Sequence, residues 1–203
     1  MANQEYINQV FKKAFGIVIS FAVLVGFVYF VDFLNKEEPL PLNFVEKYKE
    51  AVTGSKEVTE ISNSVAQKIE RVDDLQSTGK TSVALDLIDE AKLENEEAEE
   101  KASRLLSKLK DLTEMVLKIE SSKQKKELVS AIQAELVFME EFINYTSDMN
   151  NFLDSLSISV VSLNNLDEVE VRKNLELVNK KRKTINDLSN RFLAEVNQLG
   201  IFN

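Results

Sequence analysis

The stretch Ala84–Ile119, ALDLIDEAKLENEEAEEKASRLLSKLKDLTEMVLKI, decides the fold. Its core-forming positions alternate in steps of three and four residues, so that two rows interleave along one face. The rows are Ala84, Ala91, Ala98, Leu105, Leu112 and Ile119, and Ile88, Asn95, Ala102, Leu109 and Val116. Such a seam is typical of helices that pack as in a coiled coil. The pattern therefore predicts a long helix over about 82–119.

Asn95 is the polar member of this seam. A single polar side chain in a seam has two interpretations. It contacts a ligand, or it is a buried amide that fixes the register of the packed helices. The second interpretation is the better supported, because single polar seam positions often have that role.

Apolar steps of three and four continue on both sides of this helix. They predict three further helices over about 44–78, 122–163 and 168–199, with Gly54 marking a kink or a short break in the first. Very short turns force neighbouring helices to run antiparallel. The sequence thus predicts an all-α fold, an antiparallel up-down four-helix bundle over 44–203 with coiled-coil-like packing.

One turn of the predicted bundle contains a sequence that is similar to a phosphate-binding motif. Gly79-Lys80-Thr81 resembles the end of a P-loop, but Asp74 stands where that motif needs glycine. Gly79 is instead expected just after a helix end, with Thr81 capping the next helix.

The aromatic residues of the third helix are expected in the core rather than around a ligand; they are Phe138, Phe142, Tyr145 and Phe152. Glu135 interrupts an apolar row of that helix.

An unbroken apolar segment precedes the bundle: Ala14–Leu34, AFGIVISFAVLVGFVYFVDFL. A helix of this length spans roughly 30 Å, the thickness of a bilayer core. It follows a short segment, 1–13, and precedes a proline-containing linker, 35–43. The run is long for a signal peptide and lacks a small-residue cleavage site, so it predicts an uncleaved signal-anchor, a single transmembrane helix. Lys12 and Lys13 favour a cytoplasmic N-terminus, with the bundle outside the cytoplasm.

The anchor carries two pairs of small residues spaced four apart, Gly16 with Ser20 and Ala22 with Gly26. Such pairs let membrane helices pack closely, although small residues are common in membrane helices in any case. They are candidates for anchor packing in a homo-oligomer.

The predicted topology returns two parts of the chain to the membrane side. One is the turn that carries Lys123, Lys125 and Lys126, and the other is the C-terminus with Phe202. Lysines near a membrane attract anionic headgroups, and Phe inserts at the interface. These residues are candidates for contact with the lipid bilayer.

Composition excludes several classes of function. The chain has 203 residues, a net charge of −9, and neither Cys nor His. Nucleic acid is not expected as a partner, because phosphate contact needs a basic face. The acidic stretch 82–100 lacks metal-ligand spacing and is expected to be a solvated face with Glu97–Lys101 and Glu100–Arg104 pairs. The basic run Lys180–Lys183 is likewise expected to be a helix face.

No motif specifies a reaction, so the sequence predicts no catalytic residue, no metal site, no cofactor and no small-molecule ligand. We expect a non-enzymatic scaffold or protein-interaction module at the membrane surface, with a protein partner or a second copy. The alternative is an extracytoplasmic ligand-binding sensor that works with a separate signalling partner. Its layout resembles the four-helix sensor domains of chemoreceptors, in architecture alone.

Overall fold

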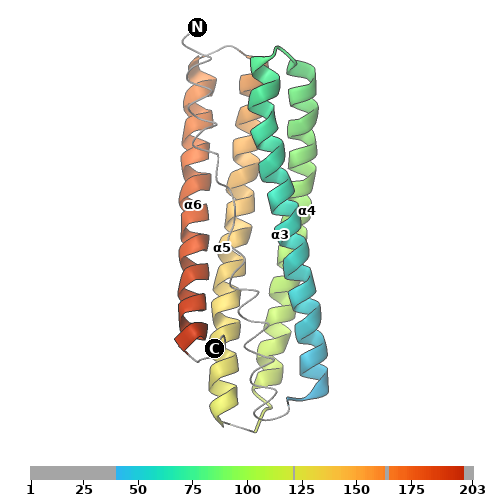
Figure 1. Ribbon diagram of the computed structural model, residues 1–203, viewed down its shortest axis with the longest axis vertical. Coiled ribbons are helices and arrows are strands. Elements are labelled where there is room, and N and C mark those ends of the chain that lie inside the picture. Colours follow the sequence, from blue (N-terminus) through green and yellow to red (C-terminus); the bar gives the residue numbers. More distant parts are fainter. Residues whose placement is uncertain (1–39, 121, 163–164, 199–203) are drawn as a thin grey trace. The chain divides into compact units, whose positions relative to one another are not determined.

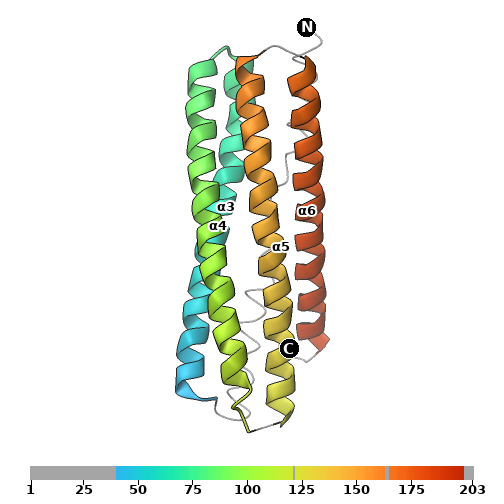
Figure 2. The same cartoon turned by 180° about the vertical axis from the view of Figure 1, so that it is seen from behind.

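Four α-helices account for nearly all of the residues that the structure describes. The structure is a computed structural model and describes residues 40–120, 122–162 and 165–198. The helices are α3 (Leu42–Ser77), α4 (Thr81–Val116), α5 (Ser122–Val161) and α6 (Asn165–Gln198) (Figures 1 and 2). No strand occurs among these residues. The predicted all-α class and the four helices are confirmed, and the helix ends lie within three residues of the expected ones.

The chain divides into two compact units, and each helix contributes a segment to both. Among the described residues, the first unit comprises 60–99 and 144–183 without 163–164. The second comprises 40–59, 100–143 without 121, and 184–198. Each unit is therefore assembled from segments far apart in the sequence, and each is described below by itself.

In the first unit, ion pairs show that α4 lies beside both α3 and α5. Lys68 on α3 lies 3.0 Å from Glu94 and 3.7 Å from Glu90 on α4. Lys92 on α4 lies 2.7 Å from Asp154 on α5. Because a short turn within this unit joins α3 to α4, these two helices run antiparallel here.

In the second unit, α3 and α4 also run antiparallel. Lys47 contacts Asp111 near the end of α4, at 3.8 Å, whereas Glu57 contacts Lys101 near the start of the α4 segment, at 2.8 Å. Hence α4 ends beside the beginning of α3. A short turn after Val116 leads to Ser122, where α5 begins, so the α5 segment starts at the same end of this unit.

The seam that predicted the fold forms the buried face of α4 and extends to Ile119 just beyond it. All eleven of its positions are buried, and none is more than 6% exposed. In the first unit the seam is mostly alanine, which allows close approach of the neighbouring helices, and in the second it is mostly larger aliphatic residues. The predicted aromatic core is confirmed too, because all four aromatic side chains of α5 are at most 2% exposed.

Gly79 ends α3 as the sequence predicts. Its φ of 72° is left-handed, where a side chain adds strain. The Gly79 N–H donates to the Gln76 carbonyl (3.0 Å) and the Lys80 N–H to the Leu75 carbonyl (2.9 Å). This pair of bonds is the Schellman motif, which satisfies the last carbonyls of a helix. The expected cap is displaced by one residue, because Lys80 accepts the first bond of α4, from the Ala84 N–H (3.0 Å).

Two other expectations have different outcomes. A kink or a short break is expected at Gly54; the break is wrong, because α3 is continuous from Leu42 to Ser77, and the kink stays a prediction. Within the described ranges, none of the helices is both long and apolar enough to cross a membrane. The predicted anchor, 14–34, lies outside those ranges and stays a prediction, as do its small residues Gly16, Ser20, Ala22 and Gly26.

Candidate functional site

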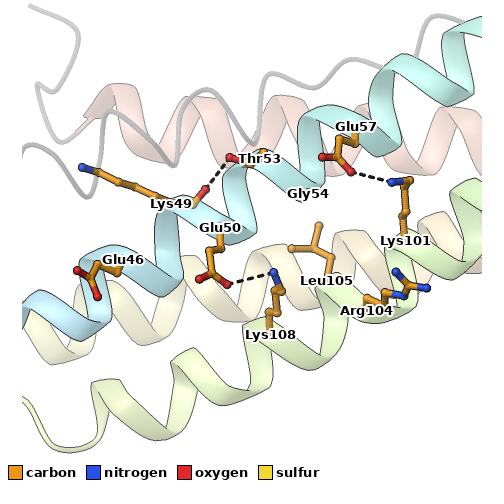
Figure 3. Close-up of a pocket in the computed structure, with 10 residues that line it drawn as sticks. All are labelled: Glu46, Lys49, Glu50, Thr53, Gly54, Glu57, Lys101, Arg104, Leu105 and Lys108. Atoms are coloured by element: carbon orange, nitrogen blue, oxygen red, sulfur yellow. Dashed lines mark hydrogen bonds and ion pairs between the residues drawn. The ribbon is translucent and has the colours of Figure 1, made fainter.

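A groove of about 540 Å³ lies between α3 and α4 in the second unit (Figure 3). Six of its residues come from α3 and four from α4. The lining consists of Glu46, Lys49, Glu50, Thr53, Gly54, Glu57, Lys101, Arg104, Leu105 and Lys108. The groove is a surface feature of the hairpin, and its floor includes the buried side chain of Leu105.

The two sides of the groove carry opposite charge. On α3, Glu46, Glu50 and Glu57 form what we call the acidic wall. On α4, Lys101, Arg104 and Lys108 form the basic wall. Each set recurs at steps of three, four or seven residues, which places its members on one face of a helix. Lys49 also lines the groove but extends away from α4 (Figure 3).

Ion pairs join the two walls. Lys101 Nζ donates to Glu57 Oε2 at 2.8 Å, and Lys108 Nζ donates to Glu50 Oε2 at 3.2 Å. The hydrogen bond from Lys101, together with its positive charge, holds the pKa of Glu57 below its usual value. Arg104 pairs with Glu100 on its own helix. Because solvent-exposed ion pairs add little to stability, charged groups of a binding partner can replace these pairs at a small cost in free energy.

Gly54 lies at the centre of the groove, opposite Leu105 and between the two ion pairs (Figure 3). A Cβ placed on Gly54 would meet no atom of the described residues within 4 Å, and the φ of Gly54 is not positive. Packing and backbone geometry therefore do not require glycine here. A glycine inside a helix costs about 0.5–1 kcal/mol relative to alanine. Because Gly54 has no side chain, the α3 backbone is left uncovered at the middle of the groove. In the sequence, Gly54 indicates only a kink or a short break in the helix and does not predict this site.

Glu135 is a second unusual feature of the second unit. Its side chain is 1% exposed, and neither carboxyl oxygen has a hydrogen-bond partner among the described residues. Burial raises the pKa of Glu135 to about 8, because an unpaired carboxylate is poorly solvated in the core. The side chain is thus protonated at neutral pH. The interrupted apolar row places Glu135 on the core face of α5, but the pattern alone does not predict its protonation state.

Asn95 is buried in the first unit, at 2% exposure. Its side-chain NH₂ donates to the Thr146 carbonyl oxygen and to Asn150 Oδ1, each at 2.7 Å. Both of its donor hydrogens are therefore used between α4 and α5. This geometry favours the predicted role in helix register over contact with a ligand.

The acidic stretch 82–100 is largely solvated: six of its eight acids are exposed, and Glu94 and Glu99 are half-buried. No group of three potential metal ligands occurs in the part of the chain that the structure describes. The expected Glu100–Arg104 pair is present. Lys101 lies 2.8 Å from Glu57 on α3, and its expected pair with Glu97 stays a prediction.

The basic run Lys180–Lys183 lies on α6, with both lysines at its ends exposed. Arg182 is half-buried, and its Nη1 atom has no hydrogen-bond partner within the described ranges. Burial raises the pKa of Tyr145 on α5, and the positive charge of Arg182 opposes that rise. Arg182 thus lies at the core edge of the first unit, in keeping with a helix face.

The candidate membrane contacts are described only in part. Lys125 is half-buried and Lys126 is exposed at the beginning of α5, the end of the second unit where α3 also begins. The side chain of Lys123 lies outside the described set, as do Lys12, Lys13 and Phe202. Their contact with lipid stays a prediction.

Comparison with known proteins adds no relative: no protein-family model, no curated protein and no solved structure matches this chain.

Proposed function

We propose that this chain is a single-pass membrane-anchored helical bundle that acts as a non-enzymatic scaffold or protein-interaction module at the membrane surface. The observation that carries the proposal is the groove between α3 and α4. It is an outer surface with walls of opposite charge, exchangeable ion pairs and an exposed stretch of backbone at Gly54. Such a surface suits a protein partner, since complementary charge gives specificity at interfaces.

The membrane part of the proposal rests on the apolar run Ala14–Leu34. In this arrangement the N-terminus is cytoplasmic, the linker 35–43 leaves the bilayer, and the bundle lies outside the cytoplasm. Lys12 and Lys13 support this sidedness. Lys125 and Lys126 then belong to the end of the second unit that follows the linker, where they would meet anionic headgroups.

The test uses the full-length chain in its native membrane. We expect the protein to remain with the membrane after extraction at alkaline pH. A variant with both Leu24→Lys and Val25→Lys should be released, because charges inside the span oppose insertion. External protease should digest the bundle in intact cells. Release of the unchanged chain by alkali would refute the anchor, and protection of the bundle would refute the sidedness.

The interaction role is tested by proximity labelling from the bundle in the same membranes. We expect labelled proteins whose recovery falls when Gly54→Leu fills the groove. Among the described residues no atom lies within 4 Å of a Cβ at this position, so the variant should keep its fold. Equal recovery of labelled proteins from the variant and the unchanged chain would show that the groove is not the binding surface.

A ligand-binding sensor is the second candidate, and the size of the groove favours it. A volume of about 540 Å³ is within the range of small-molecule sites. This candidate predicts a rise in melting temperature with a small ligand, and loss of that rise in Gly54→Leu. If the chain is an interaction module, a small ligand should leave the melting temperature unchanged, and the groove should bind a protein.

A further inference from the structure

We propose that the groove between α3 and α4 is the surface through which two copies of this chain associate, side by side and in the same direction. In this dimer Arg104 of each copy lies over Gly54 of the other. The inference rests on the proposed membrane anchoring, which would hold both copies the same way up.

The charge on the groove selects the direction of pairing. The acidic wall on α3 and the basic wall on α4 lie on opposite sides of the groove. A two-fold axis along the helices sets the acidic wall of one copy against the basic wall of the other. An axis across the helices sets like charge against like charge. Since a two-fold interface must be complementary to itself, the parallel arrangement is the favoured one.

The register of the hairpin identifies the residues that meet. Glu50 pairs with Lys108, and Glu57 pairs with Lys101. Gly54 on α3 is consequently level with Arg104 on α4. An axis along the helices preserves these levels, so it places Arg104 of the second copy opposite Gly54 of the first.

Both residues suit this contact. The side chain of Arg104 is 68% exposed, and its present partner, Glu100, belongs to the same helix. No atom of the described residues lies within 4 Å of a Cβ placed on Gly54. A guanidinium that enters there lies between Glu50 and Glu57 of the other copy, and planar paired donors are well matched to carboxylates. The dimer thus accounts for a glycine that the isolated chain does not need.

The chain contains no cysteine, so single cysteines report this contact without background. Two differently tagged full-length chains are expressed together in the membrane, one with Gly54→Cys and one with Arg104→Cys, and are then oxidised. We expect a strong disulfide between the two chains and little between two Gly54→Cys chains. The control is Lys110→Cys in place of Arg104→Cys. Lys110 is exposed on α4, but it lies about 200° around the helix from Lys108.

Two outcomes of this experiment overturn the proposal. A dominant bond between two Gly54→Cys chains shows pairing across the helices, with α3 against α3. Yields no higher than the Lys110→Cys control show that the groove does not meet a second copy and takes another protein or a small ligand.

A charge exchange supplies an independent readout that needs no cysteine. Arg104→Glu should lose self-association, as should Glu50→Arg combined with Glu57→Arg, because each sets like charges together twice. A mixture of the two variants should associate more than either variant alone, because the carboxylate introduced by Arg104→Glu in one copy then lies between the guanidinium groups introduced by Glu50→Arg and Glu57→Arg in the other. Failure of the mixture to associate, or undiminished association of either variant alone, overturns the proposal. Resistance of every variant to alkaline extraction is measured in the same samples, so loss of the anchor is distinguished from loss of the groove contact.

Discussion

Glu135→Gln should remove a strong dependence of stability on pH. The folded protein holds the Glu135 carboxyl in the core without a hydrogen-bond partner among the described residues, with a pKa of about 8 against 4.5 for the free side chain. The stability associated with the protonated group is fully present below pH 4.5, where both states are protonated. It is lost as pH rises towards 8, because the unfolded chain releases the proton that the folded chain keeps.

The size of the effect follows from the two pKa values. Each unit of difference corresponds to about 1.36 kcal/mol, so the cost of keeping Glu135 protonated at pH 7 is about 3 kcal/mol. Between about pH 5 and pH 7 the loss is about 2.5 kcal/mol. For a chain of this size that corresponds to a fall of about 5–10 °C in melting temperature.

The assay is thermal unfolding of the full-length chain in detergent micelles, followed by circular dichroism at 222 nm from pH 5 to pH 8. Glu135→Gln cannot titrate, so the difference between it and the unchanged chain isolates this group. Glu140→Gln, an exposed site on the same helix, is the matched control. The reasoning is refuted if Glu135→Gln and the unchanged chain lose stability in parallel as pH rises.

Three further substitutions test the local physics by urea unfolding of the full-length chain. Gly54→Ala should raise the free energy of unfolding by about 0.4–1 kcal/mol, because the Cβ meets open space and the unfolded chain loses freedom; a decrease would show that packing requires the glycine. Gly79→Ala should lower the free energy by about 1 kcal/mol, since φ is 72° there, and an unchanged midpoint would contradict the Schellman assignment. Asn95→Ala should cost about 1–3 kcal/mol through the loss of two buried hydrogen bonds; no loss would mean that these bonds do not stabilise the pairing of α4 with α5.

The helices and their buried faces could be predicted because they depend on spacing along the chain. Every seam position from Ala84 to Ile119 is buried as its period requires, and Gly79 ends α3 because few other residues adopt its backbone conformation. These features are local, so a single sequence contains them. The observed helix ends differ from the predicted ones by up to three residues. The spacing of apolar residues does not fix a helix end, because whether Lys80 or Thr81 caps α4 depends on individual hydrogen bonds.

The groove could not be predicted, because it depends on which exposed faces of two helices meet. The spacing of Lys101 on its own helix identifies Glu97 as a partner, but only the packing of α3 on α4 shows that Glu57 lies 2.8 Å from Lys101. Gly54 was recognised as an interruption of a helical pattern. Its position opposite Leu105 became apparent only with the register of the hairpin. For Glu135, the sequence showed an acid on an apolar row, but its charge state depends on full burial without a partner.

The most direct test of the account is photo-cross-linking from position 54 in the native membrane. A photoreactive amino acid replaces Gly54 in the full-length chain, and a second sample carries it at the exposed Lys110 on α4. The account predicts that the membrane fraction contains a covalent dimer of the chain from position 54 and none above background from position 110. Equal cross-linking from both positions, or the chain recovered outside the membrane fraction, would contradict it.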